Sequence, residues 1–161
     1  MSGIYIHIPY CKQACHYCNY HFSTSLKNKE SVISAMLKEI EIKSVGNNDL
    51  IQTIYFGGGT PSFFDTKEIN KIINSIFEKF KISENPEITL EANPDDLSNT
   101  KLIELSQSYI NRLSIGVQSF NDDELILMNR SHSSDDAKNC IDNALKSVSY
   151  THLRAHETFA N

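Results

Sequence analysis

Hydrophobic residues recur along the chain in two alternating rhythms, one typical of strands and one typical of helices. Short runs rich in β-forming residues predict strands, and segments with apolar residues three or four positions apart predict amphipathic helices between them. The predicted strands are residues 3–9, 51–56, 87–92 and 112–120. The predicted helices are residues 30–43, a segment from Ile69 to Phe80, a shorter one around 102–105, and residues 122–129 and 135–147.

Strand and helix alternate, which predicts an α/β fold of parallel strands joined by right-handed crossovers. Ligands of such folds bind at the carboxyl ends of the strands. The segment CKQACHYC follows the first predicted strand, GGGTPS follows the second, and Glu91 and Gln118 end the third and fourth. We therefore expect one shared site at this end of the sheet.

Composition narrows the class of protein. The 161 residues correspond to one domain, and a hydrophobic content of 40% with 22% charged residues is typical of a globular chain. The net charge of -5 argues against a nucleic-acid-binding protein. We read no signal peptide at the start and no apolar run near the roughly 20 residues that a membrane span needs. The expected location is the cytoplasm, where thiols stay reduced.

Three of the four cysteines lie close together with C-x3-C-x2-C spacing. A structural zinc site would need a fourth ligand, for which His16, His21 or the distant Cys140 are available. A disulfide is the weaker alternative, because an odd cluster leaves one thiol over. The spacing favours a [4Fe-4S] cluster with three thiolates and one iron free of protein ligands. Cys140 lies on the apolar stripe of its helix and is interpreted as a core residue. The three clustered cysteines are Cys11, Cys15 and Cys18.

The other candidate segments suit a polar ligand. GGGTP at residues 57–61 lacks the spacing of nucleotide phosphate loops, but its glycines allow a ligand to approach the backbone closely; a simple turn is the alternative. Glu91 ends an apolar strand, where a carboxylate needs a partner such as a cationic amino group or ribose hydroxyls. Gln118 offers a donor and an acceptor.

Five segments in this order resemble the radical S-adenosylmethionine (SAM) superfamily: IYIHIPYCKQACHYCNYHF, IYFGGGTPS, ITLEANPDDL, NRLSIGVQSFNDDEL and LMNRSHS. They look like the coproporphyrinogen dehydrogenase-like branch and are most similar to the HemW-type heme chaperones. The resemblance implies a partial (β/α) barrel of about four of the family's six βα units. Oxygen-independent coproporphyrinogen III oxidases (dehydrogenases) carry a further cysteine two residues after the third ligand. Tyr20 stands there in this chain, which favours heme handling and leaves the oxidase-like enzyme as the alternative.

The resemblance also implies roles for individual residues. The three clustered cysteines would ligate iron, and the amino and carboxylate groups of SAM would chelate the open iron. Tyr5 would lie near the sulfonium, Tyr17 beside the adenine, and Arg130 would pair with the SAM carboxylate. An inward-facing strand aromatic and a solvated helix-end arginine are the respective alternatives for Tyr5 and Arg130. No residue, His7 included, is assigned a catalytic role. The implied SAM-binding residues are Tyr5, Tyr17, Gly58, Gly59, Thr60, Glu91, Gln118 and Arg130.

Catalysis in such a protein would be reductive cleavage of SAM to methionine and a 5′-deoxyadenosyl radical. Heme would be the cargo, held by regions that this chain does not contain, with client proteins and an electron donor as further partners. Residues 1–147 are interpreted as the N-terminal part of the family domain, and residues 148–161 as a spurious tail that does not match it. The fourth strand is therefore expected to have an unpaired edge, which promotes self-association.

Overall fold

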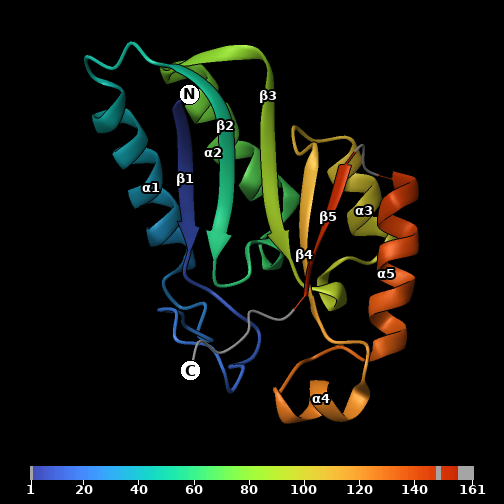
Figure 1. Cartoon of the computed structure of the whole chain (residues 1–161). Helices are drawn as coiled ribbons and strands as arrows, with labels where there is room; N and C mark the ends of the chain where they lie inside the picture. Colours follow the sequence, from blue (N-terminus) through green and yellow to red (C-terminus); the bar gives the residue numbers. More distant parts are fainter. Residues whose placement is uncertain (1, 148–149, 156–161) are drawn as a thin grey trace.

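The computed structural model describes residues 2–147 and 150–155, and Figure 1 shows a parallel sheet with helices packed against it. The strands are arranged in the order of the chain, each parallel to its neighbours, which confirms the predicted α/β fold. None of the helices in the described ranges is long and apolar enough to cross a membrane. The strands are β1 (Ser2–Ile8), β2 (Leu50–Gly58), β3 (Lys81–Ala92), β4 (Arg112–Gln118) and β5 (Tyr150–Ala155). The α-helices are α1 (Lys29–Ser44), α2 (Thr66–Lys79), α3 (Asn99–Ser106), α4 (Asp122–Leu127) and α5 (Ser134–Ser147), and the 3₁₀ turns are η1 (Pro61–Phe63) and η2 (Pro94–Asp96).

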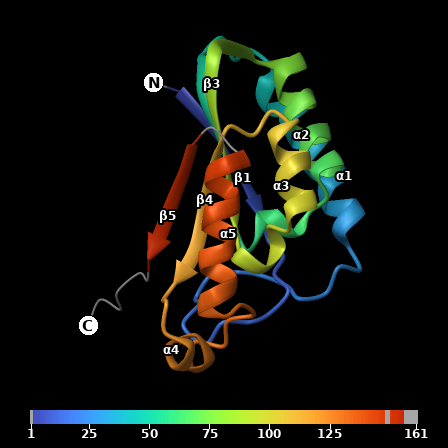
Figure 2. The same ribbon diagram turned by 90° about the vertical axis from the view of Figure 1, so that its right-hand side faces the viewer.

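The two faces of the sheet differ in character because successive side chains of a strand point to opposite faces. One face is apolar and is covered by α1, α2, α3 and α5, several of which lie on one side of the strands in Figure 2. Each isoleucine or leucine that is fully buried there stabilises the fold by roughly 1.5–3 kcal/mol. The opposite face is polar and includes Tyr5, Tyr55, Glu91 and Gln118. The apolar face and the helices on it share one core, which includes Ile8, Ile54, Phe56, Leu90, Ile115, Ile69, Ile73 and Leu105.

The end of the chain differs from the prediction. β5 pairs with β4 in a register that runs from Arg112↔Tyr150 to Gln118↔Ala155, so the expectation of an unpaired fourth strand is wrong. Parallel pairing uses backbone groups, so the formation of this ladder does not depend on a sequence motif. The interpretation of residues 148–161 as a spurious tail stays a prediction, and residues 148–149 and 156–161 lie outside the described part of the chain.

The strand boundaries differ by one or two residues in β1 and β2, and for identifiable reasons in β3 and β4. β3 begins at Lys81 rather than at residue 87, because its first half pairs with β2 and the register then shifts between Ile51 and Thr53. The first half of β3 contains polar residues and Pro86, so its sequence shows no hydrophobic alternation and was not predicted as a strand. β4 ends at Gln118 rather than at residue 120, because Gln118 has a φ of 68° and leaves the β region.

Candidate functional site

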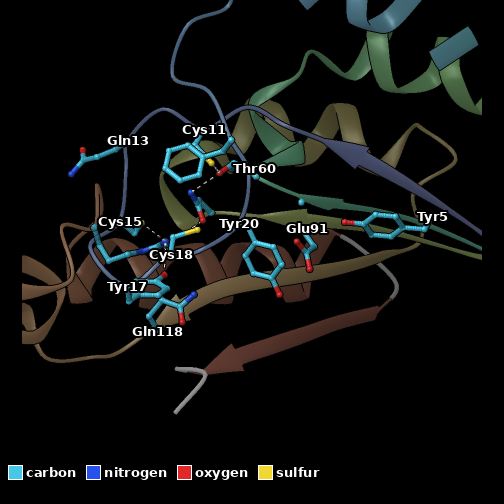
Figure 3. A pocket seen from close by; sticks show the side chains of 15 residues that line it. Tyr5, Cys11, Gln13, Cys15, Tyr17, Cys18, Tyr20, Thr60, Glu91 and Gln118 are labelled. Carbon is cyan, nitrogen blue, oxygen red and sulfur yellow. Dashed lines mark hydrogen bonds between the residues drawn. The ribbon is translucent and has the colours of Figure 1, made fainter. Parts of the chain in front are cut away.

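All of the predicted site residues line one pocket at the carboxyl ends of the strands. In Figure 3 the cysteines lie toward one end of this pocket, Tyr5 lies at the other, and Tyr20 and Glu91 lie between them. The parallel order of the sheet explains the convergence, since the segment after β1, the glycines after β2 and the last residues of β3 and β4 meet at the same edge. The predicted site residues thus lie together at this end of the sheet, and their role as one binding site stays a prediction.

The cysteine segment is a loop that is anchored at its start. The Cys11 N–H donates to the Ser23 carbonyl oxygen at 3.1 Å, and the Ser23 N–H donates to the Pro9 carbonyl oxygen at 2.8 Å. Between these bonds the buried Tyr10 ring packs against Phe64, with 5.8 Å between ring centroids. The loop therefore leaves β1 in a defined direction, with Cys11 facing the pocket.

The glycines after β2 lie directly against this loop. The Gly59 N–H donates to the Ile8 carbonyl oxygen at 2.8 Å, and the Thr60 N–H donates to the Tyr10 carbonyl oxygen at 2.7 Å. A Cβ on Gly59 would lie 2.6 Å from the Tyr10 carbonyl oxygen and 3.0 Å from Cys11 Sγ. Gly58 has a φ of 112°, which other residues rarely adopt. The segment is thus more than a turn, because its backbone forms the wall beside the first cysteine.

The surroundings of Cys11 act on the pKa of its thiol in both directions. Burial raises the pKa of the Cys11 thiol, and the other two cysteines add to this effect. The Thr60 hydroxyl, which donates to Cys11 Sγ at 3.4 Å, acts in the opposite direction, as does the positive charge of Arg130. Thiol groups must lose their protons to bind a metal, so a metal at this position has to displace the proton from Cys11.

Arg130 lies inside the pocket, which rules out the alternative of a solvated helix-end arginine. Its Nη1 donates to Cys15 Sγ at 3.3 Å and to the Tyr17 hydroxyl at 3.2 Å. Its Nη2 donates to Asn93 Oδ1 and to the Gly116 carbonyl oxygen, both at 2.8 Å. The guanidinium therefore links the cysteine loop to the ends of β3 and β4.

Tyr17 is a neutral phenol in this setting. Burial raises the pKa of Tyr17 to about 12, the Arg130 charge lowers it, and Cys15 raises it further. Its hydroxyl is therefore protonated at neutral pH, and its ring presents an uncharged aromatic surface next to the cysteines.

The opposite end of the pocket is built around Glu91, which is only 8% exposed. The Tyr55 hydroxyl donates to Glu91 Oε1 at 2.6 Å. Tyr5 stacks on Tyr55 with 6.1 Å between ring centroids, and Tyr5 OH lies 3.1 Å from His7 Nδ1. Tyr5 is 58% exposed on the open face of the sheet, so it is available to a ligand and is no core aromatic.

Gln118 owes its position to a residue that sequence reasoning missed. His132 is buried, and its Nε2 lies 3.0 Å from the carbonyl oxygen of Val117, the residue before Gln118. Burial and the charge of Arg130 lower the pKa of His132, so the neutral imidazole donates this hydrogen bond. The bond holds the backbone where Gln118 turns out of the strand.

Other residues in and around the pocket also escaped prediction. Gln13, Phe22 and Asn93 line it, and Tyr55 supports it from β2. Asn93 could have been found as the residue that follows Ala92 at the end of β3, whereas nothing in the local pattern marks the other three. Cys140 is 4% exposed in the core, which confirms its predicted place.

Within the described part of the chain, no three His, Cys, Asp or Glu side chains are placed as ligands of a single metal ion. The thiolates of a four-iron cluster bind different irons and are therefore more widely spaced than the ligands of one ion.

Comparisons with known proteins match most of the chain. The model of the radical SAM superfamily matches residues 5–154. The heme chaperone HemW of Buchnera aphidicola (subsp. Acyrthosiphon pisum) is 39% identical over 142 residues, which cover 86% of this chain and 38% of that protein. The heme chaperone HemW of Bacillus subtilis is 39% identical over 140 residues, which cover 84% of this chain and 37% of that protein.

A solved structure is similar as well. Coproporphyrinogen III oxidase (HemN) from Escherichia coli, a radical SAM enzyme, matches with a TM-score of 0.86 at 25% identity. The match covers 95% of this chain and 36% of that one. The chain thus spans less than two fifths of the length of each of these proteins.

Proposed function

The chain belongs to the radical SAM superfamily, and on that premise we propose that it is the cluster- and SAM-binding part of a heme chaperone. The observation that carries this proposal is that the three clustered cysteines and the predicted SAM-binding residues line one pocket. Heme handling is supported by relatives at 39% identity that are heme chaperones by name. A cytoplasmic location belongs to the proposal, because free thiols at such a site need a reducing compartment.

The residues present fit a [4Fe-4S] cluster. Cys11, Cys15 and Cys18 are half-buried around one pocket, and Gly59 leaves space beside Cys11 Sγ. Arg130 Nη1 lies 3.3 Å from Cys15 Sγ, and the positive charge of Arg130 partly offsets the burial that raises the pKa of the Cys11 thiol. When bound, a cluster held by three thiolates supplies an electron and an open coordination position.

SAM would lie between the cysteine loop and Glu91. Gly58, Gly59 and Thr60 would face its amino-acid end from one side, and Arg130 from the other. The neutral ring of Tyr17 is suited to stacking on the adenine. The carboxylate and carbonyl groups of this set accept hydrogen bonds from a cationic amino group, and water is displaced when the ligand fills the pocket.

The ribose would be held at the ends of β3 and β4. Glu91 can accept from its hydroxyls, and the Tyr55 hydroxyl fixes the orientation of the carboxylate. Gln118 offers both a donor and an acceptor to the same sugar. Tyr5, on the open face next to Tyr55, would lie near the sulfonium.

Replacing Glu91 with Gln is expected to weaken SAM binding about tenfold, which corresponds to about 1.4 kcal/mol. The change keeps the shape of the side chain but removes the negative charge that favours a cationic amino group or the ribose hydroxyls. Isothermal titration of the cluster-loaded protein with SAM measures the effect. Glu87→Gln is the matched control, since Glu87 lies on the same strand with a side chain 50% exposed. Wild-type affinity in Glu91→Gln would contradict the assignment.

Heme handling is favoured over porphyrinogen chemistry by one residue of the pocket. Tyr20 stands two positions after Cys18, lines the pocket, and is 61% exposed. A tyrosine there supplies no further thiol beside the SAM site. Contacts with heme, client proteins and an electron donor are proposed for parts of the protein beyond the residues matched here.

Turnover with dithionite decides between the chaperone and the oxidase-like alternative. The protein is incubated without oxygen with SAM, dithionite and coproporphyrinogen III, and 5′-deoxyadenosine and decarboxylated porphyrinogen are measured. For a heme chaperone we expect this chain to bind SAM and to leave the porphyrinogen unchanged, and we expect heme binding and transfer to an apo-hemoprotein only from a protein that also contains the parts proposed to contact heme. Decarboxylation of the porphyrinogen together with 5′-deoxyadenosine formation would establish the alternative.

A further inference from the structure

Helix α4 ends in a turn that reaches back to the cysteine loop. The Asn129 N–H donates to the Ile126 carbonyl oxygen at 3.0 Å, and the Arg130 N–H donates to the Leu125 carbonyl oxygen at 2.9 Å. This pair of bonds is the Schellman motif, in which the residue after the helix cap is left-handed and usually glycine. Asn129 has a φ of 56°. The chain therefore has asparagine at a position that glycine fits with less strain.

The Asn129 side chain makes contacts that glycine cannot make. Its Nδ2 donates to the Ala14 carbonyl oxygen at 2.7 Å, and its Oδ1 accepts from Gln13 Nε2 at 2.7 Å. Gln13 Nε2 also donates to the Asn129 carbonyl oxygen at 2.9 Å. These residues are separated by 115 and 116 positions in the sequence. The side chain thus joins the end of α4 to the residues between the first two cysteines.

Backbone contacts extend this connection toward the third cysteine. The His16 N–H donates to the Met128 carbonyl oxygen at 3.2 Å, and His16 Nδ1 lies 3.0 Å from the Leu127 carbonyl oxygen. In the described structure, residues 13–17 belong to no helix or strand. Contacts with the end of α4 therefore support this segment together with the bonds of Arg130, and Asn129 provides those to Gln13 and Ala14.

We propose that Asn129 is a positioning residue that orders residues 13–16 before any metal binds, so that Cys15 and Cys18 already face the pocket. An ordered loop loses less conformational entropy when it binds a metal, and the bound state is then more stable. The identity of the bound group rests on the proposed function, whereas the hydrogen bonds of Asn129 stand without it.

Asn129→Gly separates this role from an ordinary structural one. If Asn129 only stabilised the fold, the change would lower the melting temperature and leave the cysteine loop and its iron unaffected. Glycine adopts the left-handed conformation without strain, and this offsets the lost hydrogen bonds, so the melting temperature of the metal-free chain should be nearly unchanged. The loop nevertheless loses both side-chain bonds. We expect the amide hydrogens of His16 and Cys18 to exchange at least tenfold faster, and the cluster to lose iron to a chelator at least tenfold faster.

Gln13→Ala provides the second arm, and Asn74→Ala, an exposed change on α2, is the matched control. Gln13→Ala should speed exchange and iron loss as Asn129→Gly does, and the double variant should be little faster than either single one. Exchange and iron loss within twofold of wild type in Asn129→Gly would overturn the inference, as would fully additive effects in the double variant. If the wild type binds no iron, the proposed function fails, while exchange in the metal-free chain still decides the role of Asn129.

Discussion

Replacing Cys11, Cys15 or Cys18 with Ala, one at a time, is expected to abolish iron incorporation, from about four irons per chain to none. The three thiols line one pocket, and a cluster that already lacks a fourth protein ligand has only two left after any of these changes. Anaerobic reconstitution followed by iron and sulfide analysis measures the loss. The three variants should lose iron to a similar extent, since each thiolate binds a different iron.

The fourth cysteine is the internal control for this experiment. Cys140 lies on the buried side of α5, and burial raises the pKa of its thiol to about 12. Cys140→Ala should keep its full iron content and lower the free energy of unfolding by about 1 kcal/mol. Iron loss in this variant would contradict its place as a core residue. One zinc per chain without sulfide in the wild type would contradict the cluster itself.

Gly59→Ala is expected to lower the free energy of unfolding by roughly 3 kcal/mol and to remove most of the iron-binding capacity. The added Cβ would lie 2.6 Å from the Tyr10 carbonyl oxygen and 2.9 Å from the Tyr10 nitrogen. Both contacts are with backbone atoms, so the clash cannot be relieved by rotating a side chain. The segment that carries Cys11 must move away from β2, and the thiol moves with it.

Gly46→Ala is the matched control for the loss of a glycine. Gly46 has a φ of 73°, and a Cβ there would meet no atom within 4 Å. Its cost is therefore only the backbone strain of a left-handed alanine, about 1 kcal/mol. Chemical denaturation and iron analysis of both variants compare the two effects. A Gly59→Ala protein as stable and as rich in iron as Gly46→Ala would show that the close packing beside Cys11 is not needed.

The topology and the location of the site were predictable because they depend on periodic patterns. Alternating residues such as Ile6 and Ile8 indicate a strand. The carboxyl ends of parallel strands lie at one edge of the sheet, whatever the conformation of the loops that connect them. Glu91 and Gln118 end predicted strands, so topology alone places them with the cysteines. Arg130 was placed from motif similarity, since its position after α4 follows from no periodic pattern.

The supporting contacts were not predictable, because they join loops whose paths depend on the whole fold. The bond from Tyr55 to Glu91 spans two strands, and the bond from His132 to Val117 links a turn to a strand end. Neither leaves a periodic signal in the sequence. The left-handed backbone of Gln118 is likewise invisible in composition, because glutamine has no preference for that conformation. β5 was not predicted, because residues 150–155 were interpreted from motif similarity, which does not detect a backbone ladder.

The contrast between the two faces of the sheet has a practical consequence for redesigning the protein. Neighbouring residues of one strand point to opposite faces of the sheet. Tyr55 lies on the face of the pocket, while Phe56 is 0% exposed beneath the helices. A combinatorial library confined to the alternate strand positions that line the pocket, such as Tyr5, Glu91 and Gln118, would vary the chemistry offered to a ligand and leave the hydrophobic interior intact. Shifting the same library by a single residue would instead randomise the interior, and most of its members would fail to fold.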